Sequence, residues 1–283
     1  MSSSQRTVLI TGCSDGGLGA SLALAFHAAG LKVYATARNP SRLTQCSSAG
    51  IETLTLDVLS TASIQAAVSQ LSRLDILVNN AGAEYLMPVV DVDIADAKRL
   101  FDLNVWSYIE MTQACLPLLV QSSAGPMVVN QTSVGSVAVL PFQGVYTASK
   151  AAVAMLSDTL RLELGVLGIR VVDLKTGLVR SNLIRNQKEA KPPRLPGHSV
   201  YYPAREVVEK ALSQDSFADG GMPTLDWATA VVGDLAKSKP PPVIWRGEQA
   251  WVVRLISVLP FGMFDGILKK LTGLDIVEKT MKV

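Results

Sequence analysis

The sequence predicts an α/β protein with a doubly wound parallel sheet. Short apolar runs alternate with helical patterns along most of the 283 residues, and a glycine-rich turn follows the first run. Such alternation favours parallel strands covered by helices on both faces. Hydrophobic residues make up 48% of the chain and charged residues 18%, which suits a large buried core. We therefore expect a single domain with an apolar extension at its C-terminal end.

Each expected strand is a short apolar run, and each expected helix carries apolar residues at helical spacing. In residues 17–29, for example, Leu18, Leu22 and Phe26 share one helical face. In chain order, the pattern predicts a strand at 7–11, a helix at 17–29, strands at 32–36, 52–56 and 76–79, a helix at 103–119, a strand at 127–132, a helix at 146–166, a strand at 169–174, a helix at 225–235 and a strand at 243–245.

Residues 111–149 contain no Asp, Glu, Lys or Arg. Because Pro117, Gly125 and Pro126 interrupt this stretch, it does not predict a membrane span. We interpret it as a buried helix, a central strand and the wall of a pocket. Lys150 is the first charge after it, and a buried ammonium group needs a partner or a function.

The second half of the chain has a less regular pattern. Residues 1–249 are expected to form the main domain, in which residues 182–222 cover a site as a lid; an ordinary surface loop is the alternative. Residues 250–283 are rich in apolar side chains, but Arg254 and Pro260 interrupt them. This extension could pack on the domain, pair two subunits or lie on a lipid surface. We favour packing within the domain or between subunits over the lipid surface.

Composition argues against several functions. The formal net charge is +2 and no block of Lys or Arg stands out, so a nucleic acid is not an expected partner. The three cysteines have no paired spacing and the first residues do not read as a signal peptide, which favours a cytoplasmic protein. Two histidines without clustered Cys or carboxylate ligands predict no metal site.

Residues 11–19 read Thr-Gly-Cys-Ser-Asp-Gly-Gly-Leu-Gly and join the first expected strand to the first expected helix. Glycines in this context let the backbone approach a pyrophosphate, and the helix N-terminus supplies free N–H groups. The turn predicts a bound nucleotide, with a bare βα turn as the alternative. Asp15 would repel a pyrophosphate, so we expect it to cap the following helix and point away. The expected contacts are Gly12, Ser14, Gly17, Leu18 and Gly19.

The residue after the second expected strand indicates which nucleotide is bound. Chains that bind NAD usually carry Asp or Glu about 20 residues beyond the turn. This chain has Arg38 there, and a guanidinium can stack on adenine and pair with a 2′-phosphate. The arginine favours NADPH (or NADP+) over NADH, with help from Arg42; an ordinary surface arginine is the alternative. Asp57, after the third expected strand, is placed to bind the adenine amine.

Ser133, Tyr146 and Lys150 are the candidate catalytic residues. Tyr146 and Lys150 are four residues apart, so they share a face of the expected helix. A cation beside a phenol favours the phenolate and lowers its pKa from the usual value of about 10. Ser133 lies at the end of a strand-like run and offers a second hydroxyl to the same substrate oxygen. Together they predict a proton-transfer site.

In this order and at these spacings, the motifs resemble the classical short-chain dehydrogenase/reductase family over residues 6–181. The resemblance includes Asn79-Asn80-Ala81-Gly82 and Asn104. It implies a Rossmann fold, Tyr146 as the general acid, Lys150 as the residue that lowers the Tyr146 pKa and holds the nicotinamide ribose, and Ser133 as a donor to the substrate carbonyl. It also implies that Asn104 anchors a water that links Lys150 to solvent. The further cofactor contacts that it implies are Val58, Asn80, Ala81, Gly82, Gly177, Val179 and Ser181.

Two departures from the family pattern stand out. The glycine turn carries one extra residue, and Thr176-Gly177 stands where Pro-Gly is usual. Thr176-Gly177 and Trp245-Arg246-Gly247 are similar to the fungal NADPH-dependent 1-acyldihydroxyacetone-phosphate reductases. That similarity implies reduction of an acylated triose phosphate or another hydrophobic ketone, and a peripheral place on lipid droplets or endoplasmic reticulum. The wider family implies a dimer or tetramer.

The sequence therefore predicts an NADPH-dependent ketoreductase that acts on a hydrophobic ketone or alcohol. The alternative is a catalytically silent NADP-binding protein with a regulatory or scaffold role. The lid cations could meet a phosphate, but we favour a solvated charged face; they are Arg185, Lys188, Lys191 and Arg194. The side chains expected to line an apolar substrate pocket are Val134, Val139, Leu140, Phe142 and Val179.

Overall fold

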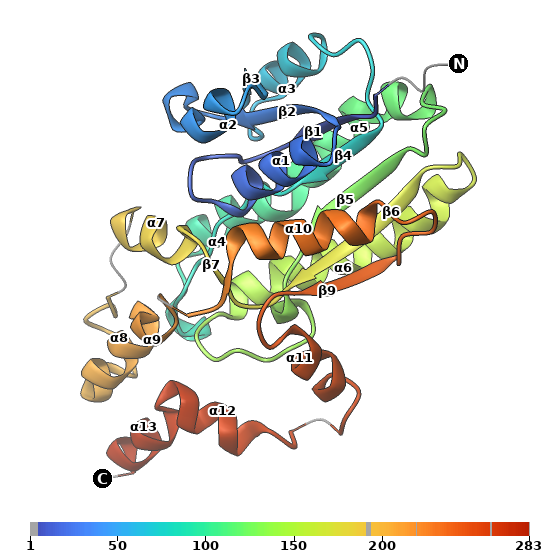
Figure 1. Ribbon diagram of the computed structural model, residues 1–283. Helices are drawn as coiled ribbons and strands as arrows, with labels where there is room; N and C mark the ends of the chain where they lie inside the picture. Colours follow the sequence, from blue (N-terminus) through green and yellow to red (C-terminus); the bar gives the residue numbers. More distant parts are fainter. Residues whose placement is uncertain (1–4, 191–193, 219, 261, 283) are drawn as a thin grey trace.

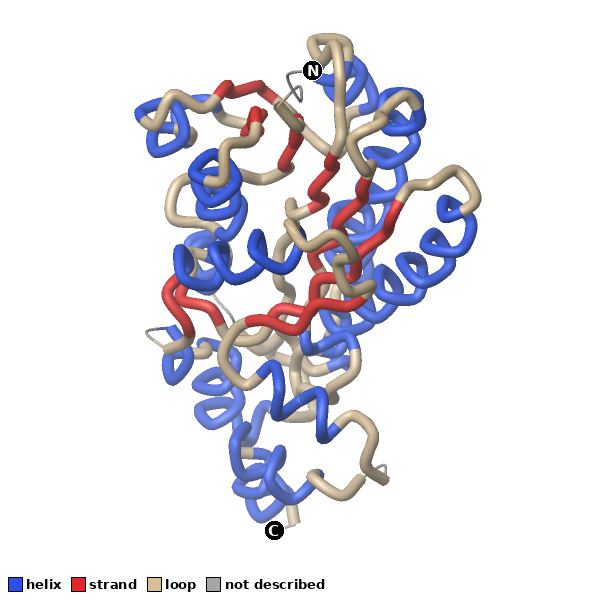
Figure 2. The backbone as a smooth tube through the Cα atoms, turned by 45° about the vertical axis from the view of Figure 1, so that its right-hand side comes forward, coloured by secondary structure: helices blue, strands red, loops and turns tan. Residues whose placement is uncertain are grey.

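A computed structural model describes residues 5–190, 194–218, 220–260 and 262–282. Its centre is a seven-stranded sheet in the order β3-β2-β1-β4-β5-β6-β9, and every neighbouring pair is parallel. Helices cover both faces of this sheet (Figure 1), and the strands fan across the middle of the molecule (Figure 2). The predicted doubly wound parallel sheet is confirmed, and all seven expected strands belong to it.

The sheet strands are β1 Thr7–Ile10, β2 Lys32–Ala37, β3 Glu52–Thr55, β4 Ile76–Asn79, β5 Met127–Gln131, β6 Arg170–Thr176 and β9 Val243–Arg246. A separate pair consists of β7 Val179–Arg180 and β8 Met222–Pro223. The helices up to and including α6 are α1 Leu18–Ala28, α2 Thr44–Ser48, α3 Thr61–Val68, α4 Ile94–Phe101, α5 Ser107–Val120 and α6 Gly144–Gly165. The later helices are α7 Leu183–Ala190, α8 Arg205–Ser213, α9 Asp215–Ala218, α10 Thr224–Leu235, α11 Ala250–Ile256, α12 Asp265–Thr272 and α13 Leu274–Met281.

The core has one apolar layer on each face of the sheet. Successive strand residues point to opposite faces, so Ile10 packs with the layer under α1 and α10, whereas Leu9 packs with the layer under α3 and α5. Trp227 of α10 and Met111 of α5 are among the largest fully buried side chains of the two layers. Since both faces are covered, the central strands β1 and β4 are almost continuously apolar.

The strand order reverses between β1 and β4, because β2 and β3 lie to one side of β1 and the later strands to the other. In open α/β sheets, ligands bind in the crevice outside the carboxyl ends of the strands at such a reversal. The glycine turn leaves the carboxyl end of β1, and the Asn80 loop leaves that of β4. The topology therefore brings these two motifs to one edge of the sheet.

The C-terminal extension packs on the domain only in part. In α13, Val277 is buried and joins an apolar cluster with Val208 of α8 and Phe142. Other large apolar side chains of the extension stay exposed, including Trp251, Leu255, Val258, Ile267 and Leu271. None of the helices within the described residues has the length and apolar character needed to cross a membrane. The expected boundary at residue 250 and the lipid contact both stay predictions.

Candidate active site

The glycine turn approaches neighbouring backbone more closely than other residues would allow. A Cβ on Gly12 would lie 2.8 Å from the Cα of Ala81, and the φ of Gly12 is +74°. A Cβ on Gly19 would lie 2.5 Å from the main-chain oxygen of Gly12. Helix α1 then starts at Leu18, and its N-cap residue Gly17 makes no side-chain cap. The first-turn N–H groups are thus available to an oxyanion, as a pyrophosphate requires.

The prediction that Asp15 caps the helix after the turn is wrong. Its carboxylate accepts hydrogen bonds from the main-chain N–H groups of Thr44 and Gln45 and from the Thr44 hydroxyl, at the start of α2. Burial alone would raise the pKa of Asp15, but these donors outweigh it and lower the pKa. The carboxylate of Asp15 is therefore bound at the N-terminal end of α2. This short helix follows β2, and the sequence analysis did not predict it.

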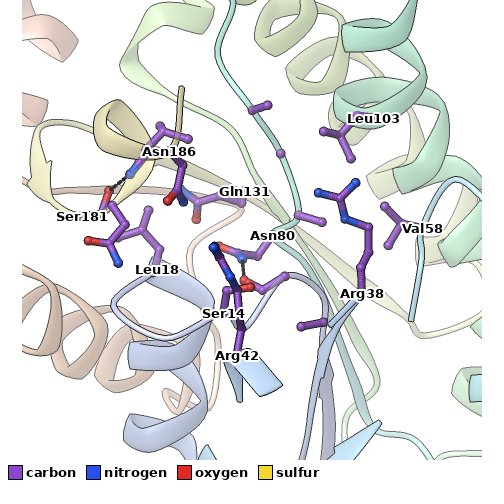
Figure 3. A pocket seen from close by; sticks show the side chains of 18 of the residues that line it. Ser14, Leu18, Arg38, Arg42, Val58, Asn80, Leu103, Gln131, Ser181 and Asn186 are labelled. Atoms are coloured by element: carbon purple, nitrogen blue, oxygen red, sulfur yellow. Dashed lines mark hydrogen bonds between the residues drawn. The ribbon is translucent and has the colours of Figure 1, made fainter. Parts of the chain in front are cut away.

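A cavity of about 550 Å³ opens in front of the turn. It is lined by Tyr146 and Lys150 and by most of the expected cofactor contacts, namely Gly12, Ser14, Gly17, Leu18, Arg38, Val58, Asn80, Ala81, Gly82 and Ser181. Gly19, Asp57, Asn104, Ser133, Gly177 and Val179 do not line this cavity. Figure 3 shows Arg38 and Val58 on one side of it and Ser181 and Asn186 on the other.

Arg38 and Arg42 both line the cavity at its exposed rim. Within the described residues, neither guanidinium has a carboxylate within the 4.0 Å of an ion pair. Both can therefore meet a phosphate without first breaking an ion pair. Asp57 instead accepts a hydrogen bond from the main-chain N–H of Leu59 at 3.0 Å, which stabilises its own loop.

The loop after β4 is tied to the end of β1. The Asn80 side chain donates to the main-chain oxygens of Thr11 at 2.8 Å and Gly12 at 3.1 Å. The Thr11 hydroxyl accepts from the main-chain N–H groups of Asn80 at 2.9 Å and Ala81 at 3.0 Å. These bonds fix the two loops relative to each other, so the cavity wall is formed before any ligand enters.

Tyr146 and Lys150 line the cavity, and Ser133, which does not line it, lies beside Tyr146. Lys150 Nζ donates to the main-chain oxygen of Gln131 at 2.9 Å and lies 6.0 Å from the centroid of the Tyr146 ring. The Ser133 hydroxyl accepts from the main-chain N–H of Gly135 at 3.0 Å and also interacts with the Tyr146 hydroxyl. Tyr146 and Lys150 are both buried, on consecutive turns of α6. Two hydroxyls and one ammonium group thus meet in a space with little water.

Burial and nearby charges shift the pKa values of Tyr146 and Lys150. Burial raises the pKa of the Tyr146 phenol, the charge of Glu84 raises it further, and the hydrogen bond with Ser133 only partly opposes them. Burial also lowers the pKa of Lys150 to about 8, although Glu84 and Asp173 attract its proton. The net shift of the Tyr146 pKa is therefore upward, and the effect of Lys150 on it stays a prediction.

Asn104 lies in a π-helical turn, Asp102–Trp106, between α4 and α5. Its amide group donates to the main-chain oxygen of Ala83 at 2.9 Å and to the Ser149 hydroxyl at 3.0 Å. Its oxygen accepts from the main-chain N–H of Ala83 at 3.0 Å. Asn104 thus joins the loop after β4 to α6, and π-helical turns are frequent at functional sites. Its predicted role as a water anchor stays a prediction.

Three residues at the site were missed by the sequence analysis. Gln131 lines the cavity, and its Nε2 donates a hydrogen bond to the Thr176 hydroxyl at 2.6 Å. Thr176 stands where the family usually has proline, so this bond satisfies the hydroxyl that the departure introduces. Asn182 lines the cavity and donates to the main-chain oxygen of Asp15 at 2.9 Å. Glu84 acts on both Tyr146 and Lys150 by its charge. The sequence signal for Glu84 was its place directly after the Asn79–Gly82 motif.

Gly177 does not line the cavity but packs against the segment after β9. A Cβ on Gly177 would collide with the main-chain oxygen of Glu248, and Leu178 pairs with Glu248 in a short antiparallel bridge. Gly247 in turn has a φ of +101° and faces Gly177. Thr176-Gly177 and Trp245-Arg246-Gly247, the two segments that are similar to the fungal reductases, therefore touch each other.

The predicted lid covers one side of the cavity, because Leu183, Asn186 and Glu189 of α7 line it. The cations expected there have partners: Arg185 lies 3.9 Å from Glu189, and Lys188 forms an ion pair with Asp215. Arg194 is exposed, and Lys191 lies outside the described residues. The residues expected to line an apolar substrate pocket are absent from the lining of this cavity.

Comparisons with known proteins agree with this geometry. The model of the short chain dehydrogenase family matches residues 6–192. A short-chain dehydrogenase/reductase of Pestalotiopsis microspora is 52% identical over 283 residues, which is 100% of both chains. The NADPH-dependent 1-acyldihydroxyacetone phosphate reductase of Schizosaccharomyces pombe is 34% identical over 279 residues, 92% of each chain. A crystal structure of a short-chain dehydrogenase from Streptomyces avermitilis has a TM-score of 0.75 at 27% identity and covers 99% of each chain.

The family match spans the glycine turn, the loop after β4 and the catalytic helix α6, and the similarity in sequence and fold continues to the end of the chain. The chain belongs to the short-chain dehydrogenase/reductase family of oxidoreductases.

Proposed function

We propose that this protein is an NADPH-dependent reductase of a hydrophobic carbonyl compound. The observation that carries the proposal is a single cavity lined by the glycine turn, by Arg38 and by the Tyr146–Lys150 pair. A nucleotide-binding turn and a buried proton donor that line one cavity are what a hydride transfer coupled to a proton transfer requires.

The residues around the cavity fit a dinucleotide phosphate. Gly12 and Gly17 let the turn pack closely, since a Cβ on them would lie 2.8 Å from Ala81 Cα and 2.9 Å from the main-chain oxygen of Ser14, and the uncapped start of α1 offers its N–H groups to a pyrophosphate. Arg38 and Arg42 supply two cations where the 2′-phosphate of NADPH would lie, and a guanidinium binds phosphate through paired, charge-assisted hydrogen bonds. Lys150 and Ser181 are the residues that we assign to the nicotinamide end. The pair Arg38 and Arg42 is what supports NADPH over NADH as the cofactor.

The cofactor, when bound, supplies the hydride that the carbonyl carbon accepts. The protein has to supply the proton, and Tyr146 carries it, since burial keeps the phenol protonated. Ser133 donates a hydrogen bond to the carbonyl oxygen and orients it toward Tyr146 Oη. Lys150, held by the main-chain oxygen of Gln131, stabilises the phenolate that remains after the proton leaves. The buried position of Tyr146 and Lys150 strengthens these electrostatic effects.

The substrate is proposed to be apolar around its carbonyl group. The loops that flank the catalytic residues carry Val137 and Val139 on their surface and an apolar cluster that contains Leu86, Met87 and Phe142. The similarity to the Schizosaccharomyces pombe enzyme, whose name gives an acylated triose phosphate as substrate, supports a substrate with an acyl chain. The proposed substrate class also includes ketone intermediates of biosynthesis that are as hydrophobic as an acylated triose phosphate.

The test is a spectrophotometric screen of acyl dihydroxyacetone phosphates and other hydrophobic ketones with NADPH and with NADH. We expect oxidation of NADPH with at least one substrate and a lower kcat/KM with NADH. Tyr146→Phe should lower kcat by about 10²- to 10⁴-fold, the range for loss of a general acid, while the NADPH dissociation constant stays within about twofold. Leu100→Val, a conservative change at the buried residue of α4, serves as the control for general perturbation.

A catalytically silent NADP-binding protein would give a different result. It would bind NADPH, as seen by fluorescence titration, but no substrate would give turnover above the rate of Tyr146→Phe. That outcome would refute the reductase proposal.

A further inference from the structure

Glu84 is a carboxylate in the catalytic centre to which the reductase mechanism gives no role. It lies in the loop after β4, two residues beyond Gly82. The side chain is half-buried, but its Oε2 atom is fully enclosed and, among the described residues, has no hydrogen-bond partner. Enclosing a carboxylate oxygen without a donor is costly, so the position calls for a physical explanation.

The backbone at this point is held firmly against the catalytic helix. The amide group of Asn104 bonds both the main-chain N–H of Ala83, at 3.0 Å, and its main-chain oxygen, at 2.9 Å. A Cβ on Gly82 would lie only 3.6 Å from Lys150 Nζ. Asn104 therefore fixes the residue before Glu84, and the loop presents Glu84 to the residues of α6.

Polar and charged groups from several elements surround the Glu84 carboxylate. Tyr146 and Lys150 face it from α6, and Gln214, the residue after α8, forms a hydrogen bond with it. A second ring of groups acts on these residues: Tyr108 of α5 on Tyr146, and Asp173 of β6 on Lys150. Burial raises the pKa of Glu84 to about 7, while the attraction of Lys150 and the Gln214 hydrogen bond oppose the rise. Lys150 and Gln214 thus favour the ionised form of Glu84, against the effect of its burial.

The two charges act on Tyr146 in opposite directions. An ammonium group favours the phenolate, and a carboxylate favours the phenol. Carbonyl reduction needs the phenol, because Tyr146 must give a proton; alcohol oxidation needs the phenolate, because Tyr146 must accept one. A fixed carboxylate beside the pair therefore shifts the balance toward the reducing form.

We propose, on the basis of the reductase function above, that Glu84 is a positioning residue of the catalytic centre, whose carboxylate keeps the proton on Tyr146 Oη and so favours reduction over oxidation. In the reducing direction the carbonyl carbon gains a hydride with its electron pair, and the C=O π pair moves to the oxygen. That oxygen takes the proton from Tyr146 Oη. The phenolate left behind regains a proton from solvent, and the charge of Glu84 makes this return more favourable.

The first test compares pH profiles of wild type and Glu84→Gln, a change that keeps the shape of the side chain. The loss of reductive kcat at high pH and the gain of oxidative kcat should both move to lower pH, on the order of one pH unit for the removal of one nearby charge. KM for the carbonyl substrate should change less than about twofold if the role is electrostatic. The matched control is Glu163→Gln, an exposed carboxylate farther along the same helix α6.

A purely structural role for Glu84 gives a different pattern. If Glu84 only links the loop to Gln214, then Gln214→Leu and Glu84→Gln should both change KM and thermal stability, and the pH profiles of Glu84→Gln and wild type should coincide. Coincident profiles would overturn the proposal.

A second measurement does not depend on turnover. The fraction of Tyr146 phenolate is read by NMR from ¹³C-labelled tyrosine, with Tyr146→Phe used to assign the signal, at the highest pH at which both proteins remain folded. Glu84→Gln should show more phenolate than wild type, and an equal fraction would overturn the proposal. If wild type reduces no carbonyl compound at all, the reductase function fails, whereas this titration still decides the role of Glu84.

Discussion

Asn182 Nδ2 donates a hydrogen bond to the main-chain oxygen of Asp15 at 2.9 Å, and this bond joins the segment after β7 to the glycine turn. The main-chain N–H of Asn182 also donates to the oxygen of Gly16, at 3.3 Å. A Cβ on Gly16 would collide with the Asn182 amide, and the φ of Gly16 is +71°. The start of the lid and the cofactor turn therefore form one unit, although 167 residues separate them in the chain.

Asn182→Ala should weaken NADPH binding, because the lid loses its side-chain bond to the turn. One hydrogen bond contributes about 0.5–1.5 kcal/mol, so the dissociation constant should rise about twofold to tenfold. Fluorescence titration with NADPH measures this change. Gln187→Ala, on helix α7 shortly after Asn182 but outside the cavity lining, is the control and should bind as wild type does. Equal affinity of Asn182→Ala and wild type would contradict the prediction.

Arg38→Ala should reduce the preference for NADPH. A charge-assisted contact between arginine and phosphate contributes about 1.5–3 kcal/mol, so KM for NADPH should rise about 10- to 100-fold. KM for NADH should stay within about twofold, since NADH has no 2′-phosphate. Steady-state kinetics with both cofactors give the ratio. Arg99→Ala, an exposed arginine of α4 paired with Asp96, controls for loss of surface charge. An equal rise of KM for both cofactors would count against a phosphate contact.

Thr176→Val should destabilise the protein. The Thr176 hydroxyl is the 2.6 Å partner of Gln131 Nε2, and the Oε1 atom of Gln131 already has no partner in the described structure. Removing the hydroxyl leaves a buried amide poorly bonded, which costs about 1–3 kcal/mol of unfolding free energy. Urea denaturation followed by circular dichroism measures the loss. Thr176→Ser keeps the hydroxyl and should be clearly less destabilised; equal losses in the two variants would mean that packing, not the hydrogen bond, decides.

Stability should fall at acid pH through Asp75, whose side chain is fully buried at the start of the sheet. Burial alone would raise its pKa, but hydrogen bonds from Ser122, the Thr7 main chain and Arg73 outweigh burial and lower the pKa below the usual value of about 3.9. A lowered pKa contributes stability that is present above pH 4 and is lost as the pH falls through the folded-state value.

Asp75→Asn tests this contribution. The variant should be less stable than wild type at neutral pH, by about 1–3 kcal/mol, because a charged acceptor of several hydrogen bonds is replaced. The difference between the two proteins should shrink as the pH falls below about 4. Denaturation midpoints at a series of pH values measure it. A constant difference at all pH values would show that the ionisation of Asp75 is not involved.

Much of the fold followed from patterns that are local in the chain. The seven strands were predicted because each is a short apolar run bounded by turn residues, and parallel strands buried on both faces have this pattern. The helix pattern of residues 146–166 identified α6 to within two residues at its start. Short helices such as α2 and α3 were missed, because five to eight residues give too little periodicity.

The candidate site was predicted unevenly. Motifs with a fixed spacing, such as Tyr146 and Lys150 or the glycine turn, were located correctly because a helix or a tight turn places their members directly. The partner of Asp15 was not predicted, because α2 is brought to the turn by the pairing of β1 with β2. The dimer or tetramer, the lipid contact and the water at Asn104 stay predictions.

The amino-acid sequence by itself determined the seven strands, the long helices, the glycine turn and the spacing of Tyr146 and Lys150, since these depend on neighbours within a few residues. Only the tertiary structure decided the protonation of Tyr146 and Lys150 and the presence of Glu84 beside them. A pKa depends on burial and on charges that approach through space, and those come here from α6, from the loop after β4 and from the end of α8. Such distances exist only once the sheet has brought these segments together.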